Sequence, residues 1–134
     1  MSVCAEDFLS TAKDLLNNGN CEIDYRNSMS RAYYAAFHLL KTITDTLPSS
    51  TNSNPAYDSH NDTIDKLLLF PKDVEQRVIA KAIRNDIIKR KAQRKSADYK
   101  LNQSINEKDA EAQLESVSLL FDEINRLKTK LGIT

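Results

Sequence analysis

The stretch PKDVEQRVIAKAIRNDIIKRKAQRKS, residues 71–96, decides the fold of this chain. Its apolar side chains fall on two separate stripes when successive residues are placed 100° apart around a helix. The first stripe consists of Val74, Val78 and Ala82, and the second of Ile79, Ile83 and Ile87. A helix that is apolar on two sides is expected to lie at the centre of a helical bundle, or to share one side with a partner chain. Pro71 is expected in its first turn, where a backbone N–H has no partner in any case.

Four further helical segments accompany this stretch. Apolar residues recur every three or four positions over residues 5–17, 24–47 and 58–69, and from the capping-box pattern SINE at 104–107 to Leu131. Gly19 and its asparagine neighbours end the first segment, and Pro48 ends the second. Residues 48–58, which are rich in Pro, Ser and Asn, are expected to form a loop. The sequence therefore predicts an all-α, up-and-down bundle of four or five helices that forms one domain over residues 1–134.

The composition is that of a globular domain. Of 134 residues, 40% are hydrophobic and 28% are charged, and no apolar run approaches the roughly eighteen residues of a membrane span. The N-terminus lacks the basic and apolar regions of a secretory signal, so a cytoplasmic location is expected, with Cys4 and Cys21 as free thiols. The spacing of cysteines and histidines does not match a zinc site, and two glycines leave little room for a phosphate-binding loop. Neither a metal nor a cofactor is expected.

Positive charge is concentrated along the expected fourth helix. Residues 77–100 contain nine basic and two acidic residues, a net charge of +7 in a chain that is neutral as a whole. Such a segment is either the solvated face of a helix or a surface that attracts a polyanion. The residues on one side that can face solvent are Arg77, Arg84, Lys91 and Lys95. Arg90 and Arg94 instead continue the isoleucine stripe, where a guanidinium is unfavourable unless an anionic group meets it.

Few other side chains in the sequence can carry chemistry. His38 follows an aromatic residue on the second expected helix, which favours a partly buried, structural histidine. His60 lies where a loop meets a helix, which favours a capping role or exposure to solvent. Tyr33 and Tyr34 are expected to pack in the core and at its rim, respectively.

Arg94, Asp98 and Tyr99 lie together at the end of the basic segment. Asp98 follows Arg94 by four residues, the spacing of a local ion pair on a helix that is worth about 0.3 kcal/mol. RNA cleavage requires that a ribose 2′-hydroxyl is aligned with the adjacent phosphate and that charge on this phosphate is stabilised. Arginine and tyrosine can stabilise that charge without a metal, and a histidine is the common proton shuttle. No histidine lies within the basic segment.

Three short motifs follow one another along the chain: SRAYYAAFHLLK at 30–41, SHNDTI at 59–64 and RKSADY at 94–99. In this order they resemble the HEPN superfamily, and especially its small stand-alone branch, over about residues 5–128. The resemblance implies an all-α fold, a homodimer and, in many members, a metal-independent ribonuclease. It also implies a place in toxin–antitoxin modules or antiviral defence, frequently beside a small nucleotidyltransferase.

The resemblance further implies a catalytic pattern, from which this chain departs. Members of the family place a histidine four to six positions after an arginine and a polar residue, close to the dimer interface. Arg84 and Asn85 match the start of this pattern, but the histidine positions hold Lys89, Arg90 and Lys91. The active site is therefore either rebuilt near residues 94–99 or lost. For a rebuilt site, the catalytic candidates are Arg94, Asp98, Tyr99 and His60, and the candidate RNA contacts are Arg84, Arg90, Lys91 and Lys95.

Two functions remain open from the sequence. The first is an RNA-directed toxin or antiviral-defence protein, with or without ribonuclease activity. The second is a non-catalytic adaptor that binds a nucleotide or a partner protein such as a nucleotidyltransferase or an antitoxin. The basic segment favours the first function, and the missing histidine favours the second. A structural helical protein with no role in nucleic-acid binding is a third, less specific alternative.

Overall fold

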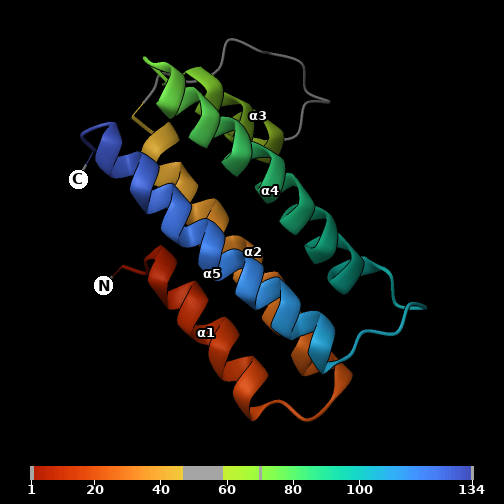
Figure 1. Cartoon of the computed structure of the whole chain (residues 1–134). Coiled ribbons are helices and arrows are strands. Elements are labelled where there is room, and N and C mark those ends of the chain that lie inside the picture. The colour runs from red at the N-terminus through yellow and green to blue at the C-terminus, as the bar shows by residue number, and fades with distance from the viewer. Residues whose placement is uncertain (1, 47–58, 70, 134) are drawn as a thin grey trace.

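The computed structural model describes residues 2–46, 59–69 and 71–133. Within these ranges the chain forms five α-helices, one 3₁₀ turn and no β-strand (Figure 1). The elements are α1 (Ala5–Asn18), α2 (Glu22–Thr44), α3 (Ser59–Lys66), the 3₁₀ turn Leu67–Leu69, α4 (Val74–Tyr99) and α5 (Glu107–Lys130). The all-α fold predicted from the sequence is confirmed. The predicted loop at 48–58 lies outside the described residues.

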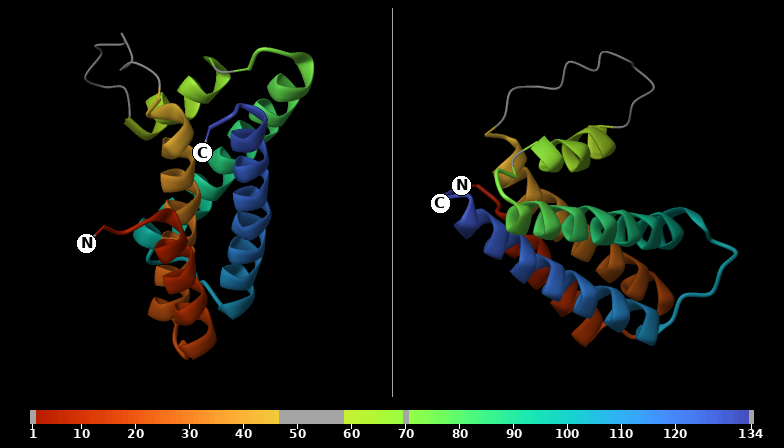
Figure 2. Two further views of the ribbon diagram at one scale, coloured as in Figure 1. Left: turned by 90° about the vertical axis from the view of Figure 1, so that its left-hand side faces the viewer. Right: turned by 45° about the horizontal axis from the view of Figure 1, so that its top comes forward.

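The central helix of the bundle is α2, because it contacts each of the other four α-helices. The long helices α1, α2, α4 and α5 run side by side, and the short α3 packs outside them against α2 and α4 (Figure 2). Small buried residues, among them Ala32, Ala35 and Ala36, allow neighbouring helices to approach α2 closely. Tyr33 and Leu40 fill the space between these contacts and are fully buried.

The first expectation for helix four, that it lies at the centre of the bundle, is therefore wrong, whereas a side shared with a partner chain stays a prediction. Its isoleucine stripe is buried in the core, as predicted. Its other stripe is not: Val74 is 68% exposed and Val78 is 62% exposed, and Ala82 is also exposed. Periodicity reveals that a helix has two apolar sides, but it does not reveal how many of them the same chain covers.

Two helix ends also differ from their predicted positions. Pro71 lies before α4, because Asp73 is the N-cap and accepts the N–H of Gln76 at 2.8 Å. At its other end α4 continues to Tyr99, three residues beyond the predicted end at residue 96. The start of α5 is capped by Asn106 and Asp109 rather than by residues 104 and 107, since each of these two side chains accepts the other residue's backbone N–H.

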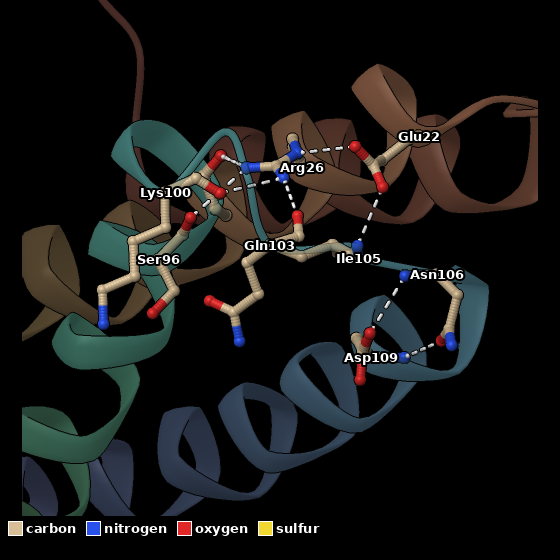
Figure 3. Close-up of polar contacts among 9 residues, drawn as sticks. Glu22, Arg26, Ser96, Lys100, Gln103, Ile105, Asn106 and Asp109 are labelled. Carbon is tan, nitrogen blue, oxygen red and sulfur yellow. Dashed lines mark hydrogen bonds and ion pairs between the residues drawn. The ribbon is translucent and has the colours of Figure 1, made fainter.

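The C-terminal end of α4 is held by two residues of the first turns of α2, Glu22 and Arg26, which we call the Arg26 clamp (Figure 3). Arg26 donates hydrogen bonds to the backbone carbonyls of Ser96 (3.3 Å), Ala97 (2.8 Å), Lys100 (3.1 Å) and Gln103, and to the Glu22 carboxylate (3.2 Å). Glu22 also accepts the N–H of Ile105 at 2.8 Å. The last carbonyls of a helix lack intrahelical donors, and here the guanidinium supplies a donor to Ala97 and a second donor to Ser96, which also accepts the N–H of Lys100. The clamp thus fixes the backbone on both sides of Asp98 and Tyr99.

Candidate functional site

Arg94 continues the buried isoleucine stripe of α4 and is only 7% exposed. Its guanidinium carbon lies 5.4 Å from the ring centre of Tyr33 and 5.6 Å from that of Tyr34, both on α2. Its Nη1 donates to Asp98 Oδ2 at 3.5 Å, which is long for a hydrogen bond. No atom of the described residues accepts a hydrogen bond from the buried Nε. The sequence correctly indicated an arginine on a packing face, and its anionic partner satisfies that arginine only in part.

Asp98 connects α4 to α2. The predicted ion pair between Arg94 and Asp98 is present. The hydroxyl of Ser30 donates to the same oxygen, Asp98 Oδ2, at 3.2 Å. Ser30 was not among the candidates from the sequence. Its position could have been noticed in the sequence, because Ser30 is a polar residue on the side of α2 that packs in the core.

His60 packs against aromatic side chains of α2. It is the second residue of α3 and is half-buried, so the predicted exposure to solvent is wrong, while the capping role stays a prediction. Its ring stacks on that of Phe37, with 4.1 Å between centres and 10° between planes. Its Nδ1 lies 2.8 Å from the hydroxyl of Tyr33, which is fully buried. Because the Tyr33 ring also contacts Arg94, one side chain connects the histidine to the arginine.

Lys91 is buried, contrary to the prediction that it can face solvent. Its Nζ donates to Asn61 Oδ1 on α3 at 3.1 Å. The reason is geometric: Lys91 lies four residues after Ile87 and three before Arg94, so its long side chain starts near the packing side of α4 and reaches α3. Asn61 is a further residue that sequence reasoning missed.

The other three basic candidates differ in their surroundings. Arg84 pairs with Asp65 on α3 at 3.3 Å. Arg90 contacts Asp86 at 3.4 Å and Gln113 on α5 at 3.0 Å. Lys95 is exposed on α4. Of the basic candidates, Arg84, Arg90 and Lys91 therefore contact neighbouring helices, whereas Lys95 stays exposed.

Tyr99, the last residue of α4, is 72% exposed. The structure thus brings Arg94 and His60 together at Tyr33, and Asp98 joins this group through its contact with Arg94. Tyr99 stays at the surface. The predicted core position of Tyr33 and rim position of Tyr34 are confirmed by their burial.

His38 is half-buried, as the sequence indicated. Its ring centre lies 4.8 Å from that of Phe8 on α1 and 5.6 Å from that of Phe37. Burial lowers the pKa of His38, and the positive charges of Lys41 and Arg31 lower it further. The imidazole is consequently uncharged at neutral pH.

Chemically, the cluster around Tyr33 combines a fixed positive charge with a titratable ring. A search of the described residues finds no group of three or more His, Cys, Asp or Glu that could hold a metal ion. Cys4 and Cys21 are free and exposed. None of the helices in the described ranges is long and apolar enough to cross a membrane.

Comparison with known proteins gives one match. The family model described as HEPN domain matches residues 4–127. No curated protein and no solved structure matches the chain significantly. Since the matched region covers nearly the whole sequence, the chain belongs to the HEPN domain family.

Proposed function

We propose that this HEPN chain acts on RNA, as a toxin or antiviral-defence component that cleaves the RNA backbone without a metal ion. Membership of the family supports a HEPN-type role in general. The observation that carries the proposal is the position of Tyr33, whose ring lies 5.4 Å from the Arg94 guanidinium and whose hydroxyl lies 2.8 Å from His60 Nδ1. Tyr33 therefore contacts both a cation, Arg94, and a ring nitrogen, that of His60. Attack by a 2′-hydroxyl requires a cation that stabilises the phosphate and a base that accepts the proton.

In the proposed reaction, the 2′-oxygen of a ribose attacks the adjacent phosphorus while its proton passes to His60. The Tyr33 hydroxyl lies 2.8 Å from Nδ1 of this ring and helps to hold the imidazole in place. The bond from phosphorus to the 5′-oxygen breaks, and that oxygen takes a proton from the imidazolium. The products are a 2′,3′-cyclic phosphate and a 5′-hydroxyl. Arg94 stabilises the negative charge that develops on the phosphate oxygens.

The remaining candidates have supporting roles in this proposal. Asp98, held by Ser30, orients Arg94 through their 3.5 Å contact. Tyr99 and Lys95 are exposed and are proposed to contact RNA directly. Arg84, Arg90 and Lys91 have partners within the chain, so each would exchange a protein contact for a phosphate contact.

A homodimer is part of the proposal, supported by the exposed apolar side chains along α4. They are Val74, Val78 and Ile88. We expect a dimer at micromolar concentration in light scattering. Val78→Asp should produce a monomer, because an unpaired carboxylate would be buried in the interface. Ile23→Asp, at an equally exposed aliphatic residue of α2, is the control and should remain dimeric. A wild-type monomer would contradict this part of the proposal.

RNA binding tests the proposal directly. The change is the double substitution Arg94→Ala and Tyr99→Ala, and the measurement is the affinity for total RNA and tRNA by filter binding. We expect binding to fall at least tenfold while circular dichroism shows unchanged helicity. Arg126→Ala, at a half-exposed arginine of α5, is the control. Unchanged binding by the double variant would refute the proposed site.

One observation favours a second function, a non-catalytic adaptor that binds a nucleotide or a partner such as a nucleotidyltransferase or an antitoxin. Arg84, Arg90 and Lys91 already have protein partners, so three of the four candidate RNA contacts are engaged within the chain. Salt dependence distinguishes the two functions. Contacts to single-stranded phosphates give a slope of about −0.7 per phosphate in log K against log salt, whereas an apolar groove for a partner protein gives a small slope.

A further inference from the structure

One side of α2 that the core does not cover carries Arg31, Tyr34, His38 and Lys41. Their spacings of three, four and three residues place them in a line along the helix. Each of the four is half-buried, whereas Ala32, Tyr33 and the other neighbours on the opposite side are fully buried. Two aromatic rings therefore lie between two cationic side chains along one accessible line, and rings with cations are the composition of sites that bind single-stranded nucleic acid.

This line continues the candidate site. The guanidinium carbon of Arg31 lies 5.2 Å from the ring centre of Tyr34, and that of Arg94 lies 5.6 Å from the same centre. The ring of Tyr34 is thus contacted by two arginines. Arg94 belongs to the candidate site, and Arg31 lies outside it. Arg31 is also 5.9 Å from the ring centre of Phe8 on α1. Its position between two rings holds the guanidinium in place while it remains partly exposed.

Two neighbouring hollows lie along the same line, and both are bordered by Val3 and Phe8. The smaller hollow, of about 200 Å³, is bordered by Arg31 and Asp7. The larger one, of about 470 Å³, contains both aromatic rings and polar groups. The charged and aromatic residues of its lining are Glu6, Phe8, His38, Lys41, Asp45 and Lys128.

The charges of the larger hollow decide what it can hold. Its two lysines are balanced by two carboxylates, so the hollow has no net attraction for a phosphate. Its polar groups can instead bond the edge of a base, and the rings of Phe8 and His38 can contact the face of that base. His38 suits this role because a neutral imidazole stacks without carrying a charge into the hollow. A phosphate can instead contact the Arg31 guanidinium, which lies at the same Tyr34 ring as Arg94.

We infer that Phe8, Arg31 and His38 form a subsite for the nucleotide that neighbours the cleaved phosphate of a single-stranded RNA. The base enters the larger hollow, and its phosphate contacts Arg31. This inference rests on the proposed function, since it extends the RNA path from the site around Tyr33. The same chemistry, a base with one phosphate, also occurs in a free nucleotide, and the experiment separates the two sources.

The experiment measures binding without cleavage. The probe is a fluorescein-labelled 12-nucleotide single strand with 2′-O-methyl riboses, which cannot attack the phosphate, and the readout is fluorescence anisotropy. Arg31→Gln should weaken binding about tenfold and reduce the salt slope by about 0.7. His38→Ala should weaken binding about tenfold with no change in slope, because it removes stacking rather than a phosphate contact. Arg126→Gln is the matched control and should bind as wild type does.

Three results would overturn the inference. If both variants bind the strand as tightly as the wild type, the subsite does not exist, although the site at Arg94 can still be correct. If AMP binds the wild type and not His38→Ala while RNA binding is equal in both, the hollow takes a free nucleotide. If the wild type binds no RNA, the proposed function fails together with the subsite. Because Arg31 is partly exposed, Arg31→Gln keeps the test valid even if His38→Ala unfolds.

Discussion

Arg26 and Arg94 are two buried arginines with very different surroundings. They are 5% and 7% exposed, respectively. Arg26 donates to four backbone carbonyls and to Glu22 (Figure 3). Arg94 has one long contact to Asp98 and two aromatic rings, and its Nε has no acceptor among the described residues. The two guanidinium groups are therefore equally buried but differ in how many of their N–H donors have acceptors.

The difference indicates what each arginine does. A buried cation whose donors are all used is part of the scaffold, and its removal leaves several acceptors without donors. A buried cation with an unused donor is less favourable for stability and retains the capacity to meet an anion. We therefore assign Arg26 to stability and Arg94 to the candidate site.

The largest effect that we expect is on stability at Arg26. Arg26→Met removes the guanidinium donor from the carbonyls of Ala97 and Gln103, and takes one of the donors from Ser96, Lys100 and Glu22. It should lower the free energy of unfolding by about 3 kcal/mol. Urea denaturation followed by circular dichroism measures the change. Arg126→Met, at an exposed arginine, is the control and should change stability by less than about 0.5 kcal/mol. Equal curves for the two variants would show that the clamp is unimportant.

Arg94→Met should have a smaller effect on stability. Methionine keeps the apolar contact with the rings of Tyr33 and Tyr34, and it removes a buried charge that is only partly satisfied. We expect the free energy of unfolding to change by less than about 1 kcal/mol, measured in the same way, while RNA affinity falls at least tenfold. If Arg94→Met were as destabilising as Arg26→Met, the distinction between the two arginines would be wrong.

The smallest effect concerns the pH dependence of the clamp. The pKa of Glu22 lies below its ordinary value of 4.5, chiefly because the carboxylate accepts the N–H of Ile105 and also because it pairs with Arg26. A lowered pKa in the folded state means that the stabilisation is complete above pH 4.5 and is lost as pH falls through the lower folded value. The melting temperatures of wild type and Glu22→Gln should therefore differ at pH 7 and converge as pH falls through the lowered folded pKa of Glu22. A constant difference across this range would contradict the assignment.

The sequence predicted those parts of the site that depend on local spacing. Arg94 and Asp98 are four residues apart on one helix, so their pairing follows from helical geometry alone. Arg94 was also found by its position on the isoleucine stripe. Both inferences follow from the geometry of a single helix and do not depend on which helices pack against it.

Contacts between distant helices could not be predicted in this way. Arg26 meets the end of α4 across more than 70 residues of sequence. His60 reaches Tyr33, and Lys91 reaches Asn61, only because α3 folds back onto α2 and α4. Helical periodicity identifies the apolar side of each helix. It does not specify which other helix packs against that side. For the same reason, the exposure of Val78 was not foreseen.

The central claim, that Arg94 serves an RNA-cleaving site, is tested most directly by incubating the purified protein with total RNA and tRNA in EDTA. Arg94→Ala and the control Arg126→Ala are incubated in parallel. The account predicts that wild type and Arg126→Ala produce fragments with 2′,3′-cyclic phosphate and 5′-hydroxyl ends, and that Arg94→Ala produces none. Intact RNA with all three proteins, or equal cleavage by Arg94→Ala, would contradict it.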